Sequence, residues 1–323
     1  MQHFLLSAKA RTLCLKSVFR MGEDKAYETF CELRWTATDG EPVCPQCGCL
    51  ESYAITTRRK FKCVGCHHQF SVTSGTIFAS RKLSYTDLLA AIAIFVNGAK
   101  GVSALQVSRD LDVQYKTAFV LSHKLREAMA AEQDQRALSG TVEVDGAYFG
   151  GYVKPANNKA DRVDRRLKSN LNGKRQSVII MRERRGRSLT FMASSEAAGV
   201  AMVQAHVAPD ATVHADEASH WDALHRGYDA RRINHSFSYS DGNACTNLAE
   251  SYFSRLRRAE IGTHHKIAGP YLAAYASEMA WREDNRRVAN GTQFTMVVGA
   301  AFSSRVSRKW KGYWQRLDRA VAA

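Results

Sequence analysis

The sequence predicts an α/β protein in which a zinc ribbon and a helix-turn-helix region precede the main domain. Three observations support this fold class. Four cysteines stand in two Cys-x-x-Cys pairs, two short helical segments meet at a tight turn, and strand-like runs then alternate with helix-like runs. Acidic residues on those later runs indicate that the α/β domain carries the chemistry.

Composition narrows the classes of partner. The chain has 323 residues, so about two or three domains are expected at roughly 100–200 residues each. Lys and Arg outnumber Asp and Glu by 46 to 31, and the resulting net charge of +15 is typical of a nucleic-acid-binding protein. No apolar run approaches the roughly 20 residues of a membrane-spanning helix, so no membrane association is expected.

The N-terminal sequence and the cysteines indicate a compartment. MQHFLLSAKARTLCLK lacks the apolar stretch of a signal peptide, so none is expected. The cysteines follow metal spacing instead of a disulfide framework, which favours the reducing cytoplasm.

The cysteine pairs predict a structural Zn²⁺ site. A gap of 15 residues separates the two pairs, and the expected ligands are Cys44, Cys47, Cys63 and Cys66. Cys49, His67 and His68 are near enough to substitute, and a redox dithiol is the less favoured alternative. The segment between the pairs carries Arg58 and Arg59, which are expected to contact DNA phosphates.

The period becomes helical after Leu83. A segment capped by Ser103 runs to Leu111, and a second begins near Tyr115, with a tight turn between them. This spacing predicts a helix-turn-helix, although a plain helical linker would show the same period. The candidate base-reading residues at the start of the second helix are Gln114, Tyr115, Lys116 and Thr117.

Strand-like segments follow over 141–149, 177–181, 188–193 and 212–216. Asp145 lies on the first and Asp216 ends the fourth, while Glu250 lies on a later helix. Carboxylates that converge from strands and a helix can hold Mg²⁺ or Mn²⁺, a site suited to phosphoryl transfer on a nucleic acid. Glu143 shares a strand face with Asp145 and is a minor ligand candidate.

Longer stretches resemble the ISXO-type bacterial insertion-sequence transposases, relatives of the eukaryotic Merlin elements. The similar stretches are Cys44–Gly48, the segment FKCVGCHHQFSVTSGTIF that ends at Phe78, Val142–Gly151 and Thr246–Arg287. The resemblance implies a ribonuclease-H-like catalytic domain with a DDE-type metal site. Asp145, Asp216 and Glu250 match the acidic positions of the family.

The helix of Glu250 carries further candidates. Asn247 shares its face, and because some relatives use Asn as the third ligand, the choice between the two stays open, with Glu250 favoured for its charge. Arg257 lies two turns on, where the family usually has Lys, and it is expected to hold DNA together with Arg258. His264 and His265 fall in the family's usual histidine region. This position suits contact with the scissile phosphate or the DNA strand end, and equally a histidine that only packs or lies at the surface.

Two basic segments are expected to contact DNA as well. The stretch 150–176 is rich in Lys and Arg, with Arg165 and Arg166 as its named candidates, although a solvated surface would look the same. The stretch 305–319 mixes cations with Trp310, Tyr313 and Trp314, which suits either nucleic-acid contact or a docked amphipathic helix.

The expected domains are an N-terminal helical segment (1–40), the zinc ribbon (41–78), the helix-turn-helix region (79–136), the catalytic domain (137–295) and a basic tail (296–323).

The expected function is transposition: binding of terminal inverted repeats, end cleavage, and joining of the 3′-OH to target DNA through two Mg²⁺ ions. A homodimer or higher oligomer on double-stranded DNA in the bacterial nucleoid is implied. The alternatives are a DNA-binding regulator, an inactive remnant, and a nuclease or resolvase without joining activity.

Overall fold

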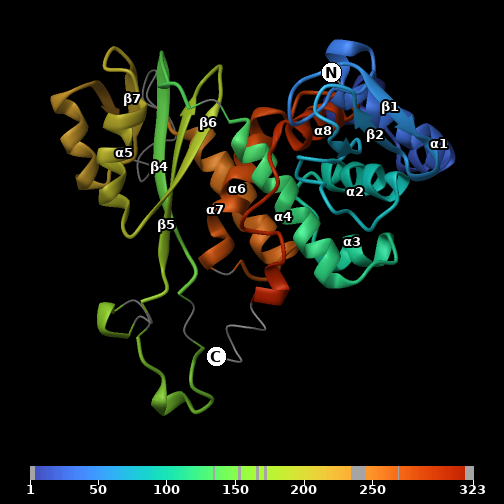
Figure 1. Cartoon of the computed structure of the whole chain (residues 1–323). Coiled ribbons are helices and arrows are strands. Elements are labelled where there is room, and N and C mark those ends of the chain that lie inside the picture. The colour runs from blue at the N-terminus through green and yellow to red at the C-terminus, as the bar shows by residue number, and fades with distance from the viewer. Residues whose placement is uncertain are drawn as a thin grey trace. The chain divides into compact units, whose positions relative to one another are not determined.

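The computed structural model describes residues 4–133, 135–151, 154–164, 167–170, 173–233, 245–267 and 269–316. The chain forms two compact units (Figure 1). Unit 1 combines Met1–Gln133 with Asn285–Ala323, and unit 2 is Asp134–Asp284. Among the described residues, no helix has the length and apolar character needed to span a membrane.

Unit 1 contains a small antiparallel sheet. Its strands are β1 (Ser52–Ile55), β2 (Lys60–Cys63) and β3 (Gln69–Phe70), paired in that order. The rings of Trp35, Phe61 and Phe70 pack together, with centroids 5.6–6.5 Å apart. This aromatic cluster supplies the core that so short a sheet cannot form from its strands alone.

Helices form the rest of unit 1. They are α1 (Leu15–Arg34), α2 (Tyr85–Asn97), α3 (Ala104–Asp110), α4 (Tyr115–Ala131) and α8 (Asn290–Ser303). Ser103 Oγ accepts a hydrogen bond from Gln106 N at 3.1 Å, which fixes the predicted start of α3. Asp112 takes a left-handed conformation (φ 49°) in the turn before α4, so α3 and α4 follow the predicted helix-turn-helix order.

Helix α8 belongs to the core of unit 1 although it lies far along the sequence. It packs against α1, α2 and α4. The ring of Phe302 lies 5.3 Å from that of Phe30 and 5.7 Å from that of Phe78. Residues 296–303, which the sequence assigns to a basic tail, therefore continue a packed helix.

Unit 2 is built on a mixed five-stranded sheet of order β6-β5-β4-β7-β8. The strands are β4 (Thr141–Phe149), β5 (Gln176–Glu183), β6 (Ser188–Ala193), β7 (Thr212–Ala215) and β8 (Asp229–Arg232). β4, β5 and β6 are antiparallel, whereas β7 and β8 run parallel to β4. The four predicted strands are confirmed, but β8 was not expected because its four residues, Asp-Ala-Arg-Arg, carry no apolar alternation.

Helices cover both faces of this sheet (Figure 1). On one face α6 (Asn247–Gly262) and α7 (Gly269–Asp284) pack on Ala147, Phe149 and Ile180. On the other, α5 (Gly199–His206) and a 3₁₀ helix, η8 (Ser219–Arg226), pack with Val142 and Val144. The α/β class predicted from the sequence is confirmed, and the mixed sheet is consistent with a ribonuclease-H-like domain.

A buried ion cluster fastens α6 and α7 to the sheet. Arg182 on β5 lies 3.1 Å from Glu283 on α7, and Arg255 on α6 pairs with the same carboxylate. Arg182 also donates to Leu248 O at the start of α6, at 3.1 Å. Buried charges are tolerated only when paired in this way, so the cluster fixes where α6 lies on the sheet.

Candidate active site

The four predicted zinc ligands meet at one point. Their sulfur atoms all lie within 4.8 Å of one another, with Cys44 Sγ 3.6 Å from Cys66 Sγ and Cys47 Sγ 3.5 Å from Cys63 Sγ. Tetrahedral zinc with Zn–S bonds of about 2.3 Å needs sulfurs roughly 3.8 Å apart. The observed spacing fits a structural Zn²⁺ held by four thiolates.

Two of the three alternative zinc ligands, Cys49 and His68, make other contacts. Cys49 Sγ lies 3.7 Å from Glu51 O and contacts that carbonyl instead of the cluster. The His68 ring stacks on Phe70, at 6.4 Å between centroids. The regular cysteine set therefore accounts for the site without either residue.

Parallel pairing brings the first two acids together. Glu143 on β4 is opposite His214 on β7, and Asp145 and Asp216 each follow two residues later. Because the two strands run in the same direction, equal steps along them end at neighbouring positions. Asp145, in the middle of β4, and Asp216, directly after β7, thus stand at neighbouring positions, and Glu250 lies in the first turn of α6.

The electrostatics of Asp145 report this crowding. Burial, followed by the nearby charges of Asp216, Glu196 and Glu250, raises the pKa of Asp145 to about 7. The backbone N–H of Gly146, 2.7 Å from Asp145 Oδ1, acts in the opposite direction. Partly buried carboxylates that repel one another would be stabilised in their ionised form by a divalent cation.

The acids do not form a closed cage by themselves. Within the described part of the chain, the cysteine quartet is the one group of three or more such side chains whose ligand atoms all lie within 4.8 Å. The carboxylate oxygens of Asp145, Asp216 and Glu250 therefore do not all lie within 4.8 Å of one another. Their oxygen donors suit Mg²⁺ or Mn²⁺, which bind through few carboxylates and retain water or substrate oxygens.

Strand β8 holds the Asp216 turn. Arg232 donates to the backbone oxygens of Asp216 and Ala218, and it also pairs with Asp222 in η8. Asp216 Oδ1 in turn accepts from Ala218 N at 3.1 Å. The unexpected edge strand therefore positions one of the expected site residues.

Glu143, predicted as a minor ligand candidate, has other partners. Its buried carboxylate accepts from Arg184 Nε at 3.0 Å through one oxygen, and from Leu248 N at 2.7 Å through the other. Arg184 also contacts His214 Nδ1 at 3.0 Å, and that nitrogen accepts from Cys245 N at 3.1 Å. Glu143 satisfies an N–H group at the start of α6 and so fixes the helix that carries Glu250.

Glu196 is an acid of this site that sequence reasoning missed. A Cβ at Gly146 would lie 2.5 Å from Glu196 Cγ, so the Glu196 side chain lies against the residue next to Asp145. Burial raises the pKa of Glu196, as does the charge of Asp216, while Arg175 and Arg257 oppose the shift. The available signal was its position just after a predicted strand and before a helix.

The predicted phosphate contacts on the ribbon differ from each other. Arg58 ends the short 3₁₀ turn between β1 and β2 and is exposed. Arg59 pairs with Glu23 and Asp24, and its guanidinium lies 5.1 Å from the Tyr27 ring. The structure therefore gives Arg59 an intramolecular set of partners that the sequence did not indicate.

The other predicted DNA contacts are exposed at helix surfaces. On α4 and the residue before it, these are Gln114, Tyr115 and Lys116; around α6 they are Asn247, Arg257, Arg258 and His265. Arg257 lies over the Phe149 ring at 4.9 Å, which places it beside the acidic site. Arg165 and Arg166 lie outside the described residues.

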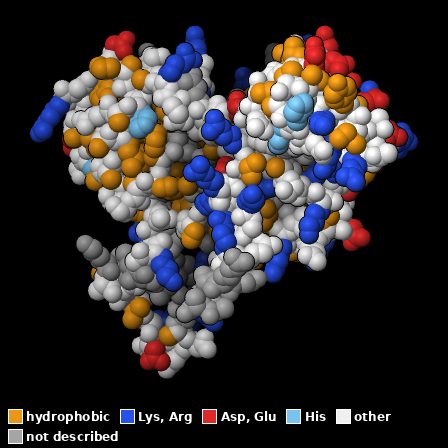
Figure 2. Space-filling model, viewed as in Figure 1, with side chains coloured by type: hydrophobic (Ala, Val, Ile, Leu, Met, Phe, Trp, Pro, Cys, Tyr) orange, Lys and Arg blue, Asp and Glu red, His pale blue; other side chains and the backbone are white. Residues whose placement is uncertain are grey.

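Lys and Arg side chains are scattered over the face drawn in Figure 2, on both units, and outnumber Asp and Glu there. This distribution agrees with the net charge of +15. A broad positive surface attracts the phosphates of a nucleic acid without regard to sequence. Around Asp145, in contrast, the negative charges of Asp216, Glu196 and Glu250 act on one place of a protein with a positive net charge.

Fold and site together define a class: a zinc-ribbon protein whose α/β domain brings together carboxylates from its sheet and from a helix. Residues 137–284 match the family model of the ISXO2-like transposase domain, and residues 21–69 match that of the transposase zinc-ribbon domain. The chain belongs to the ISXO-type transposases, as its sequence motifs predict. A search of curated proteins found no match.

Loss of one zinc ligand should release the metal. Cys63→Ser is expected to purify without stoichiometric zinc and to lose the fold of the ribbon, because the metal contributes much of the stability of so small a sheet. Zinc content and circular dichroism would measure this. Cys49→Ser is the matched control and should keep its zinc; equal zinc in both variants would contradict the assignment.

Removal of the Glu143 carboxylate should destabilise unit 2. Glu143→Ala removes the carboxylate that accepts from Arg184 Nε and from Leu248 N at the start of α6. It is expected to lower the free energy of unfolding by about 3 kcal/mol. Urea denaturation would measure the change. The exposed Glu217→Ala is the control, expected to remain within about 0.5 kcal/mol of the wild type.

Asp145 should make the metal-free protein less stable as pH rises. Its pKa is about 7 in the folded protein and 3.8 ordinarily, so the folded state binds the proton more tightly, and stability falls between these values. Asp145→Asn, which resembles the protonated form, should be more stable than the wild type at pH 8, by roughly 2 kcal/mol. Thermal melts in chelator at both ends of this window would test it. A difference that does not shrink toward pH 4 would argue against this titration.

Proposed function

We propose that this chain is a DDE transposase that binds the terminal inverted repeats of its element, cleaves the ends and joins the freed 3′-OH to target DNA. One observation carries the proposal: Asp145 in the middle of β4 and Asp216 just after β7 stand at neighbouring positions, and Glu250 lies on α6, close enough for its charge to act on Asp145. This arrangement lies within the segment that matches the ISXO2-like transposase domain.

The acids would hold Mg²⁺ or Mn²⁺, which when bound lowers the pKa of the attacking hydroxyl and neutralises charge on the leaving oxygen. Asp145 supports this role because burial and the charges of the neighbouring acids both raise its pKa, and a bound cation would relieve both. Glu250 is favoured over Asn247 as the third ligand. Its charge acts on Asp145, whereas the Asn247 amide is neutral and exposed.

Cations beside the acids would hold the DNA strand. Arg257 and Arg175 both act electrostatically on Glu196, so positive charge borders the acidic site. A phosphodiester placed there would have its non-bridging oxygens near the arginines and its reacting phosphorus near the carboxylates. Hydrolysis and joining are both in-line displacements at phosphorus, so a single site can serve for both.

The remaining parts would locate the DNA. The ribbon and the α3–α4 pair are the candidate readers of the terminal repeats, and phosphate contacts would give affinity that falls with salt. Two ends must be processed together, so a homodimer or higher assembly on double-stranded DNA is part of the proposal. The bacterial nucleoid is its expected place of action.

The test is an in vitro reaction of the purified full chain with its element's end DNA, Mg²⁺ and a supercoiled target. End cleavage and joining are expected, and Asp145→Asn should lower both by a factor of about 10³ or more while leaving end binding intact. Glu217→Gln, an exposed neighbour of Asp216, is the charge-matched control and should react as the wild type does.

Each other outcome selects a different function. Binding without any cleavage favours a DNA-binding regulator or an inactive remnant. Cleavage without joined products favours a nuclease or resolvase. Normal cleavage by Asp145→Asn would remove Asp145 from the mechanism.

Glu196 should tune the metal requirement. Glu196→Gln removes a negative charge beside Asp145, so the Mg²⁺ concentration for half-maximal cleavage is expected to rise about tenfold, with a smaller effect at saturating Mg²⁺. A Mg²⁺ titration of the cleavage rate would measure this shift. An unchanged midpoint would show that Glu196 has no part in holding the cation.

A further inference from the structure

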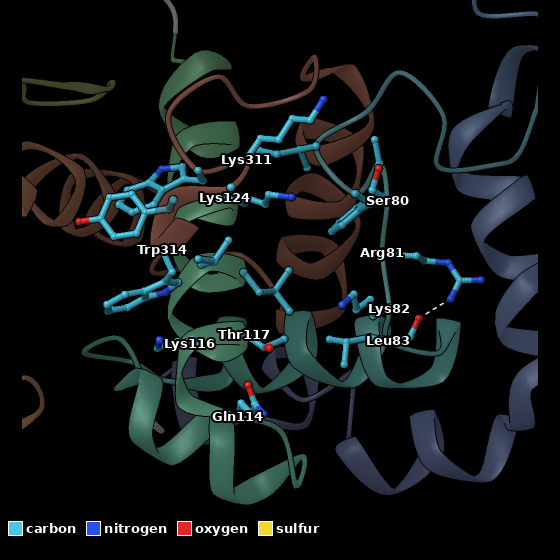
Figure 3. Close-up of a pocket in the computed structure, with 18 of the residues that line it drawn as sticks. Ser80, Arg81, Lys82, Leu83, Gln114, Lys116, Thr117, Lys124, Lys311 and Trp314 are labelled. Atoms are coloured by element: carbon cyan, nitrogen blue, oxygen red, sulfur yellow. Dashed lines mark hydrogen bonds between the residues drawn. The ribbon is translucent and has the colours of Figure 1, made fainter. Parts of the chain in front are cut away.

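A groove in unit 1 runs beside the start of α4. Its walls are the first three turns of α4 with the residue before them, the segment Ile77–Leu83, and the segment Trp310–Gln315. The cavity has a volume of about 430 Å³. These three segments are far apart in the sequence, and Figure 3 shows them around one space.

The groove is strongly basic. Its lining contains no Asp or Glu, whereas five side chains carry positive charge: Arg81, Lys82, Lys116, Lys124 and Lys311. Two of them have partners of their own. The Arg81 guanidinium lies 3.5 Å from the Tyr85 ring, and Lys116 Nζ lies 5.1 Å from the Trp314 ring.

The other three lysines line the same groove. In Figure 3, Lys124 reaches from α4 toward the segment that contains Ser80, Lys82 points back toward α4, and Lys311 lies at one end of the same space. Like charges that line one groove repel one another. An anion between them would therefore be stabilised.

The positive charge of Lys124 is only partly balanced by negative charge nearby. Burial lowers its pKa, and Glu127 offsets the shift only in part. Glu127 is itself engaged, because its carboxylate accepts from Ser307 Oγ at 2.6 Å. No described residue forms an ion pair with the Lys124 ammonium within 4.0 Å.

Aromatic packing holds Lys311 in place. The neighbouring Trp310 is buried, and its ring lies 4.3 Å from that of His123 and 5.9 Å from that of Phe119 on α4. Trp314 also packs on Phe119, at 5.9 Å. The C-terminal segment is thus a docked part of unit 1, and the docking fixes a lysine at the groove.

We propose that this groove binds the sugar-phosphate backbone of duplex DNA, with Lys82, Lys124 and Lys311 contacting phosphates. The proposal rests on the proposed DNA-binding function and extends it to a C-terminal segment. Gln114 and Lys116, the candidate base readers, line the same groove, so the two kinds of contact are continuous.

The dimensions agree with this assignment. Gln114 and Lys124 are ten residues apart, which is about 15 Å along a helix. The major groove is about 12 Å wide and is bordered by phosphates. When the start of α4 reads base edges, Lys124 therefore reaches the backbone at the border.

The experiment measures binding of the full chain to two duplexes of equal length, one from the terminal inverted repeat and one scrambled, over a range of salt concentrations. Lys124→Met and Lys311→Met keep the apolar stems and remove the charges. Each should weaken binding to both duplexes several-fold and reduce the slope of log K against log salt by about 1. Lys16→Met, an exposed lysine outside the groove and outside the segments expected to contact DNA, is the matched control and should leave the slope unchanged.

Each result decides between the alternatives. Slopes equal to that of the wild type in both lysine variants, with folding confirmed by circular dichroism, would overturn the proposal and leave DNA binding by the chain intact. An effect on the repeat duplex alone would assign the groove to base reading instead of phosphate contact. If the wild type binds neither duplex, the proposed function fails together with the groove.

Discussion

The arrangement of unit 2 depends on the bonds that Glu143 makes across three elements. Its carboxylate joins β4 to Arg184 after β5 and to the first backbone N–H groups of α6. Two residues along β4 stands Asp145, and two residues after Leu248 stands Glu250. A single buried acid thus relates the strand of one candidate ligand to the helix of another. Because a strand and a helix hold Asp145 and Glu250, these two acids of the site are positioned by rigid elements.

Charge is distributed in opposite ways in the two units. In unit 2, negative side chains gather around Asp145 at a cost that its raised pKa expresses. In unit 1, lysines gather around the groove beside α4, and burial lowers the pKa of Lys124. Each cluster is unfavourable without a counter-charge, and the proposed DNA complex supplies both. A divalent cation would neutralise the acids of unit 2, and DNA phosphates would neutralise the lysines of unit 1. This complementarity is the physical link between binding and chemistry in the proposed reaction.

Much of the fold could be predicted from local signals. Cysteine spacing gave the ribbon, Ser103 gave the start of α3, and alternation along 141–149 gave β4, because each depends on residues close together in the chain. The strand β8 and the place of α8 in unit 1 were not predictable in this way. β8 owes its pairing to β7, and α8 owes its position to contacts with α1, α2 and α4. Such contacts leave no periodic trace in the sequence.

By itself, the sequence determined the inventory: four thiolates at zinc spacing, acids at the ends of apolar runs, an excess of cations, and motifs sufficient to identify the family. The tertiary structure decided which of these groups meet. It separated Glu143 from Asp145 in role although they share a strand face, added Glu196 to the acids, and gave Arg59 internal partners. It also joined Lys311 to Lys82 and Lys124. The reason is that pKa shifts, ion pairs and grooves depend on distance in space, which pairing register and helix packing set and sequence separation does not.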